Sequence, residues 1–83
     1  MEYSFSPRAL KDISKLPVVV QRRLIRKLNH FVIQEYPLRY AETLINSALG
    51  QYRFRVGDYR VIFDMVEGKI KVLRVGHRQS IYK

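Results

Sequence analysis

The chain has 83 residues, a formal net charge of +9 and no cysteine. This length fits one domain, 1–83, with a single small core, and leaves no room for a second one. The lack of cysteine excludes disulfides and thiolate metal sites, and it fits the reducing cytoplasm, where we expect the protein. No apolar run reaches the roughly 20 residues of a membrane span, so no membrane partner is expected.

The charge balance predicts an anionic partner. Sixteen Lys and Arg residues stand against seven Asp and Glu residues. Such an excess is typical of proteins that bind nucleic acid, and an acidic protein is the second candidate. A membrane surface ranks third.

The first half of the chain predicts a strand and two helices. Residues 2–5 alternate polar and apolar side chains, as a short strand does. Ser6 and Pro7 form an N-cap and a first helical residue, so a helix of about ten residues follows. Pro17 opens a second helix, and Pro37 ends it by disfavouring helical geometry at Tyr36. The short connection predicts an antiparallel helix hairpin, and a turn of helix is expected within residues 40–46.

The second half predicts three strands, at residues 51–56, 59–66 and 69–75. Gly57-Asp58 suits a type II′ turn, and Glu67-Gly68 suits a type I′ turn or a G1 bulge. The expected fold class is therefore α+β. A short N-terminal strand and the antiparallel helix hairpin accompany a C-terminal three-stranded antiparallel meander, and the first strand extends the meander sheet.

The first of these turns sets two arginines face to face. A two-residue loop pairs Arg55 with Arg60, and it places Arg53 further along the same face. Like charges directly opposite each other destabilise a sheet, so folding alone would not select this pairing. A polyanion laid across the face would make it useful. The same counting pairs Val75 with Arg60, while Arg74 breaks the alternation and indicates a bulge or an edge position.

The segment after the last strand, 75–83, carries further polar groups. Gly76 lets the chain bend toward the strand that bears Arg60, so Arg78 and Arg55 are expected to approach each other. His30 and His77 lie in different elements without a carboxylate cluster, so neither a metal nor another cofactor is expected.

Three segments of the chain resemble a known family. Residues 52–63, 72–78 and the pair Ile81-Tyr82 look like the RelE branch of the RelE/ParE toxin superfamily, and the likeness covers essentially the whole domain. It implies a toxin of a type II toxin–antitoxin system, neutralised in a hetero-oligomer by a cognate acidic antitoxin. It also implies ribosome-dependent, metal-independent cleavage of mRNA in the A site, in which the 2′-hydroxyl attacks the adjacent phosphate.

The resemblance implies roles for single residues as well. Arg60 matches the family's phosphate-binding arginine, Arg78 the arginine after the last strand, and Tyr82 a C-terminal tyrosine that stacks on or orients the substrate. Arg53 and Arg55 fall where the best-studied member has lysines, one of them proposed as general base.

This difference leaves the general base open. Arginine is effectively never deprotonated, so it cannot readily take the proton of the 2′-hydroxyl. His77 or Tyr82 must then serve, or the ribosome contributes, and His77 is slightly favoured because a histidine titrates near neutral pH.

Two further surfaces are predicted. The sheet face that carries the arginines also carries Ile62, Leu73 and Val75, which would bind an acidic, apolar antitoxin segment that folds on them. The polar side of the second helix offers basic residues to an extended nucleic acid: Arg22, Arg23, Arg26 and Lys27.

Two alternatives to the nuclease stay open. One is a ParE-like inhibitor of DNA gyrase, although such members generally lack the full set of basic residues with the tyrosine. The other is a non-catalytic RNA-binding module, which would bind RNA with a strong salt dependence and cut nothing.

Overall fold

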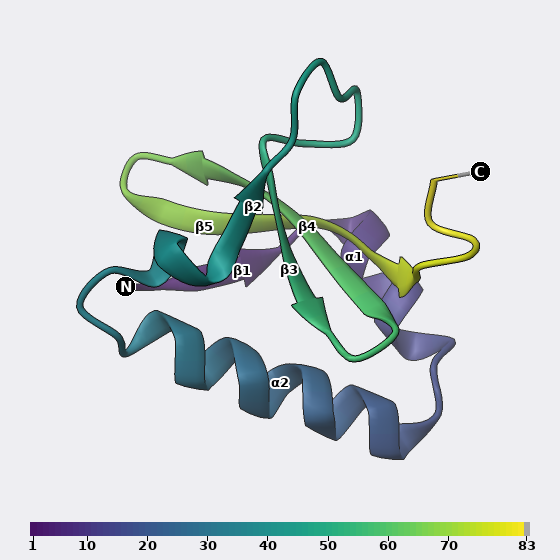
Figure 1. Ribbon diagram of the computed structural model, residues 1–83. Coiled ribbons are helices and arrows are strands. Elements are labelled where there is room, and N and C mark those ends of the chain that lie inside the picture. Colours follow the sequence, from purple (N-terminus) through teal and green to yellow (C-terminus); the bar gives the residue numbers. More distant parts are fainter. Residues whose placement is uncertain (83) are drawn as a thin grey trace.

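The computed structural model describes residues 1–82 and shows a mixed sheet of five strands with two α-helices (Figure 1). The elements follow in the order β1 (Tyr3–Phe5), α1 (Pro7–Ser14), α2 (Val18–Val32), the short 3₁₀ helix η1 (Pro37–Tyr40), β2 (Ala41–Thr43), β3 (Tyr52–Val56), β4 (Tyr59–Val66) and β5 (Lys69–His77). The sheet order is β1-β5-β4-β3-β2, and β1 runs parallel to β5. The predicted α+β fold, the meander and the extension of its sheet by the first strand are confirmed.

The helices begin where the sequence indicates. The Ser6 side chain accepts a hydrogen bond from the Ala9 amide at 3.0 Å, which satisfies one of the free donors of the first turn of α1. The Pro17 carbonyl accepts the Gln21 amide at 3.0 Å at the start of α2. That helix ends at Val32, earlier than Pro37 predicts, because the chain tightens there and the Gln34 amide turns back to the Phe31 carbonyl.

The turns fix the register of the meander. Gly57 has φ +59°, and the next strand begins two residues later, so Val56 pairs with Tyr59 as predicted. At the second turn both Glu67 and Gly68 have positive φ, of 52° and 75°, which identifies the type I′ alternative.

A β-bulge interrupts the pairing of β4 with β5. Ile62 pairs with Arg74 and Phe63 with Val72, so Leu73 is the extra residue on β5. The expected pairing of Val75 with Arg60 is therefore wrong, because the bulge shifts the register by one residue. Val75 pairs instead with Val61, and Gly76 faces Arg60.

Helix α1 satisfies the backbone groups that the bulge leaves free. The Ser6 hydroxyl donates to the Leu73 carbonyl at 3.1 Å, and Asp12 Oδ2 accepts the Val75 amide at 3.0 Å and Arg74 Nε at 2.8 Å. Burial alone would raise the pKa of Asp12, but the Val75 amide and the Arg74 guanidinium outweigh it and lower that pKa below its usual value. The bulge and α1 therefore stabilise each other.

Both helices pack on the same face of the sheet and enclose the core. Phe54 lies at its centre, with its ring 4.6 Å from that of Phe31 and 4.5 Å from that of Phe63. The buried members of the core are Ala9, Leu24, Leu28, Phe31, Val32, Phe54, Val56, Val61, Phe63, Ile70, Val72 and Val75. In the part of the chain that the structure describes, no helix is long and apolar enough to cross a membrane.

The outer face of the sheet is partly covered by the connection from β2 to β3. A Cβ built on Gly50 would lie 2.7 Å from Ile62 Cγ2, which shows how closely this connection packs over β4. Ile62 is consequently fully buried, and the bulge turns Val75 into the core. The expected exposure of Ile62 and Val75 is therefore wrong, and Leu73 alone of the three stays partly accessible.

Strand β2 replaces the turn of helix expected within residues 40–46. It pairs antiparallel with β3, setting Thr43 opposite Tyr52 and Glu42 opposite Arg53. The Leu44 amide then donates to the Gln51 carbonyl at 2.8 Å and closes the connection. As an edge of the sheet, β2 places a carboxylate beside the arginines of β3.

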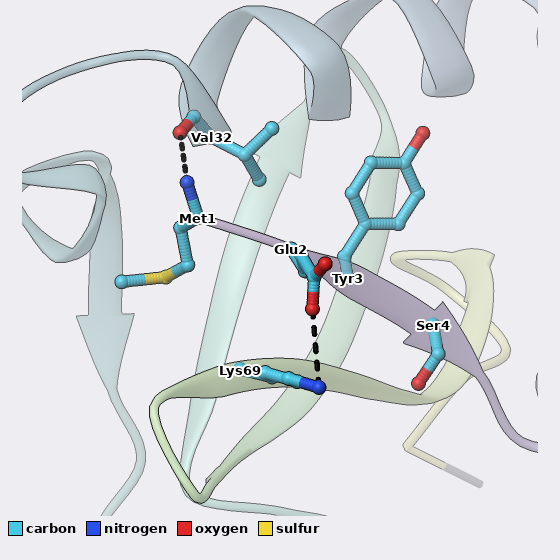
Figure 2. Close-up of a pocket in the computed structure, with 6 residues that line it drawn as sticks. All are labelled: Met1, Glu2, Tyr3, Ser4, Val32 and Lys69. Atoms are coloured by element: carbon cyan, nitrogen blue, oxygen red, sulfur yellow. Dashed lines mark hydrogen bonds and ion pairs between the residues drawn. The ribbon is translucent and has the colours of Figure 1, made fainter.

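A pocket of about 430 Å³ lies beside β1, at the edge of the sheet opposite β2 (Figure 2). The Met1 ammonium donates to the Val32 carbonyl at 3.1 Å, so a positive charge meets the negative end of α2. Glu2 pairs with Lys69 at 3.1 Å, as the dashed line in Figure 2 shows. These contacts fasten β1 to α2 and β5.

The contact of Asp12 with the bulge predicts a pH-dependent loss of stability. At pH 7, Asp12→Ala should lower the free energy of unfolding by about 2 kcal/mol, because the Val75 amide and Arg74 lose a charged partner. A carboxylate whose pKa is lowered by folding stabilises the protein above its unfolded pKa, and this contribution is lost as the pH falls through the folded pKa. The difference from the wild type should therefore shrink below roughly pH 4. Denaturant titration at pH 7 and below roughly pH 4 measures this difference in unfolding free energy, with Lys11→Ala in the same helix as control. An equal difference at the two pH values would contradict the role of the Asp12 charge.

Candidate functional site

Three arginines lie on the outer face near the β3–β4 turn. Arg55 pairs with Arg60 and Arg53 pairs with Ile62, as the turn predicts. Side chains alternate along a strand, and the intervening Phe54 and Val61 point into the core. All three guanidinium groups therefore belong to the side of the sheet that faces away from the helices.

Glu42 neutralises part of this charge, although no pattern in the sequence indicates it. Its Oε2 lies 2.7 Å from Arg53 Nη2, and its Oε1 forms an ion pair with Arg55 Nε. The hydrogen bond from Arg53 and the charges of Arg53, Arg55 and Arg60 together hold the pKa of Glu42 below its usual value. One ionised carboxylate thus lies among three cations.

The C-terminal tail brings Tyr82 to the same place. Ile81 is 4% exposed, its side chain packs over Gly76, and its amide donates to the His77 carbonyl at 3.0 Å. Arg53 Nη1 donates to the Tyr82 hydroxyl at 2.7 Å, and the guanidinium carbon lies 5.9 Å from the centre of the ring. The hydrogen bond to Glu42 and then the one to Tyr82 raise the pKa of Arg53, so both partners stabilise its charged form.

The β3–β4 turn gathers the remaining cations. Arg60 is 8% exposed, and its Nη1 donates to the carbonyls of Gly57 and Tyr59, both at 2.9 Å. The Arg78 amide donates to the Asp58 carbonyl at 2.8 Å, and Arg78 Nε lies 3.6 Å from Asp58 Oδ1. Both arginines are therefore attached to one tight turn.

Among the basic residues of α2, Arg23 comes closest to this turn. Its Nη1 lies 3.2 Å from where a Cβ on Gly57 would be. Arg22, Arg26 and Lys27 are exposed along the helix. A shallow pocket of about 260 Å³ is lined by Val19, Arg22, Arg23 and Arg26. The first half of α2 therefore reaches the β3–β4 turn through Arg23.

His77 lies apart from the arginine face. It pairs with Tyr59, which packs on the core, so both side chains belong to the side of the sheet that faces the helices. The two rings meet edge to face at 5.5 Å, and His77 Nδ1 accepts the Gln79 amide at 3.1 Å. Within residues 1–82 no group of three His, Asp or Glu side chains is placed to hold a metal ion.

Known structures share this fold. The chain is similar to a chain of the toxin–antitoxin complex RelBE2 from Mycobacterium tuberculosis, with 25% identity, a TM-score of 0.75 and coverage of 93% of this chain and 96% of that one. A RelB–RelE complex from Methanococcus jannaschii gives 24% identity, a TM-score of 0.73 and coverage of 95% and 94%. A RelE–RelB complex from Pyrococcus horikoshii gives 23% identity and a TM-score of 0.68, with coverage of 95% of this chain and 96% of that one.

The family comparison covers almost the whole chain. No curated protein matches it significantly. The model of the ParE toxin of type II toxin–antitoxin systems, parDE, matches residues 3–82. The structural matches add that the toxin is RelE-like. The chain therefore belongs to the ParE toxin family, and it is a RelE-like toxin of the RelE/ParE superfamily.

Proposed function

We propose that this toxin is a metal-independent endoribonuclease that cuts mRNA in the ribosomal A site. The 2′-hydroxyl attacks the adjacent phosphate and leaves a cyclic phosphate. The observation that carries this proposal is the gathering of Arg53, Arg55 and Arg60 around one carboxylate, with Arg78 on the adjoining turn.

Such a cluster suits phosphoryl chemistry. Negative charge builds on the phosphate oxygens in the transition state, and guanidinium groups that are already fixed there need little reorganisation. Arg60 is fixed by two backbone carbonyls, and Arg53 by Glu42 and Tyr82. Both guanidinium groups are therefore already held in place before a phosphate binds.

Tyr82 suits contact with a base of the RNA. Its side chain is 46% exposed, while its hydroxyl is held by Arg53. Stacking of a nucleobase on an exposed aromatic ring contributes on the order of 1–3 kcal/mol to binding. The tyrosine would thereby orient the strand beside the arginines.

An acidic antitoxin is the second proposed partner, because the chain carries a net charge of +9 and its structural relatives are toxin–antitoxin complexes. A groove of about 610 Å³ between α1 and α2 is lined by the exposed Leu10 and the half-buried Ile13, with Arg22 and Arg26 beside them. A segment that combines apolar and acidic residues suits this groove. On the arginine face, the proposed antitoxin contact is confined to Leu73, because Ile62 and Val75 are buried.

The family match itself favours an alternative, a ParE-like inhibitor of DNA gyrase. That function needs a binding surface and no catalytic cluster, so it would not require opposed arginines. A gyrase supercoiling assay with the isolated protein distinguishes the two, since inhibition there without RNA cleavage would favour the alternative.

Arg78 provides the first test. Arg78→Ala should reduce codon-specific cleavage in a purified translation system by about 10²–10³, because one fixed cation at the phosphate is lost. The fold should persist, since this side chain is 55% exposed and makes one weak ion pair. Mapping of mRNA 5′ ends measures the loss, and Arg39→Ala, an exposed arginine away from the arginine face, is the control. Cleavage by Arg78→Ala at the wild-type rate would contradict the role.

The position of Arg23 gives a second test by RNA binding. Arg23→Ala should weaken binding of single-stranded RNA severalfold and reduce the slope of log K against log salt by about 0.7, the value for one lost phosphate contact. Lys27→Ala removes the same charge from the same helix, and it should change binding less. Equal effects of both variants in salt-titrated binding would show that the helix acts only through its net charge.

A further inference from the structure

The proposed reaction needs a group that takes the proton of the 2′-hydroxyl. The arginines of the outer face cannot do so, because guanidinium stays protonated. His77 belongs to the other side of the sheet. A tyrosine hydroxyl such as that of Tyr82 is a weaker proton acceptor than a carboxylate, because it ordinarily keeps its own proton at neutral pH. The base must therefore come from another group on the arginine face or from outside the protein.

Glu42 is placed for this role. Strand β2 sets it opposite Arg53, and its two carboxylate oxygens contact Arg53 and Arg55. Its side chain is nevertheless 42% exposed, so a substrate can reach it from the solvent side. A phosphate bound between Arg55 and Arg60 would lie next to this carboxylate, with the ribose beside it.

We propose that Glu42 is the general base of the cleavage, an inference that rests on the proposed function. Glu42 takes the proton from the 2′-hydroxyl as the 2′-oxygen forms a bond to phosphorus. The bond from phosphorus to the 5′-oxygen breaks, and a water molecule supplies that oxygen with its proton. Glu42 then returns its proton to the solvent, which leaves the 2′,3′-cyclic phosphate and a free 5′-hydroxyl.

Substrate binding would make Glu42 a better base. In the free protein the surrounding arginines hold its pKa low, which stabilises the ionised form but weakens it as a proton acceptor. A phosphate competes for Arg55 and brings a negative charge close to the carboxylate. Both changes raise the pKa of a carboxylate toward the range where general bases work well.

The free carboxylate also opposes RNA binding, and this opposition separates catalysis from structure. Glu42 repels the phosphate and occupies two of the cations that would bind it. Loss of its charge should therefore weaken cleavage and strengthen binding at once. A carboxylate that only stabilised β2 would not move these two quantities in opposite directions.

Glu42→Gln tests this inference, because it keeps the shape and a hydrogen-bond acceptor and removes the charge. Single-turnover cleavage on programmed ribosomes should fall by about 10²–10⁴. Binding of an mRNA with a 2′-deoxy residue at the cut site, which cannot react, should become tighter. Glu35→Gln, an exposed acid away from the arginines, should leave both measurements unchanged.

Glu42→Asp keeps the charge, and it should retain more activity than the glutamine variant even if Glu42→Gln unfolds at a lower temperature. The wild-type rate should fall on the acid side as a carboxylate protonates, and this limb of the pH profile should be absent in Glu42→Gln. If the wild type cuts and Glu42→Gln cuts at a rate within a few-fold of it, the assignment of Glu42 as general base is wrong and the proposed nuclease function stands. A wild type that cuts nothing would overturn the proposed function and the base with it.

Discussion

Repulsion between like charges on the outer face is the constraint around which this small protein is arranged. Arg55 and Arg60 are directly opposed across a two-residue hairpin, and Arg53 follows on the same side. Such a pairing opposes sheet formation, so other parts of the chain must compensate for it. The compensation comes from three sources, namely the Glu42 carboxylate, the backbone carbonyls of the turn and the hydroxyl of Tyr82.

The outer elements of the fold are explained by this compensation. Strand β2 has only three residues, yet it delivers Glu42 to Arg53. The connection from β2 to β3 packs on Ile62, while Ile81 packs over Gly76 and holds the tail that carries Tyr82. The helices supply the core on the opposite face, so the strands that carry the arginines are packed against buried side chains on their other side.

The sequence predicts the features that depend on neighbouring residues. The turn at Gly57 fixes the pairing of Arg55 with Arg60, and the caps at Ser6 and Pro17 fix where the helices begin, because each involves contacts within a few residues. The bulge at Leu73 escapes prediction in detail, because it is stabilised by Ser6 and Asp12, more than 60 residues away. Arg74 did indicate an irregularity there.

The candidate site was predictable to a similar extent. The arginines on one hairpin form a pattern that is visible in the sequence. Glu42 belongs to a strand too short to show alternation, and its place beside the arginines depends on the pairing of β2 with β3. Burial of Ile62 likewise depends on a long connection whose path no local rule predicts. His77 failed as a partner of the arginines because the bulge and the alternation of β5 place it on the other side of the sheet.

The superfamily fold alone does not decide between cutting RNA and binding another target, because function depends on the site that a fold carries. Here the site works against the stability of the fold, with opposed cations and with an Arg53 Nε that is buried and unpaired in the described part of the chain. Natural sequences tolerate such local conflicts mainly where function requires them. A surface that only docks on a protein would gain little from a carboxylate held among three arginines, whereas a reaction that must bind a phosphate and remove a proton beside it needs both kinds of charge in one place.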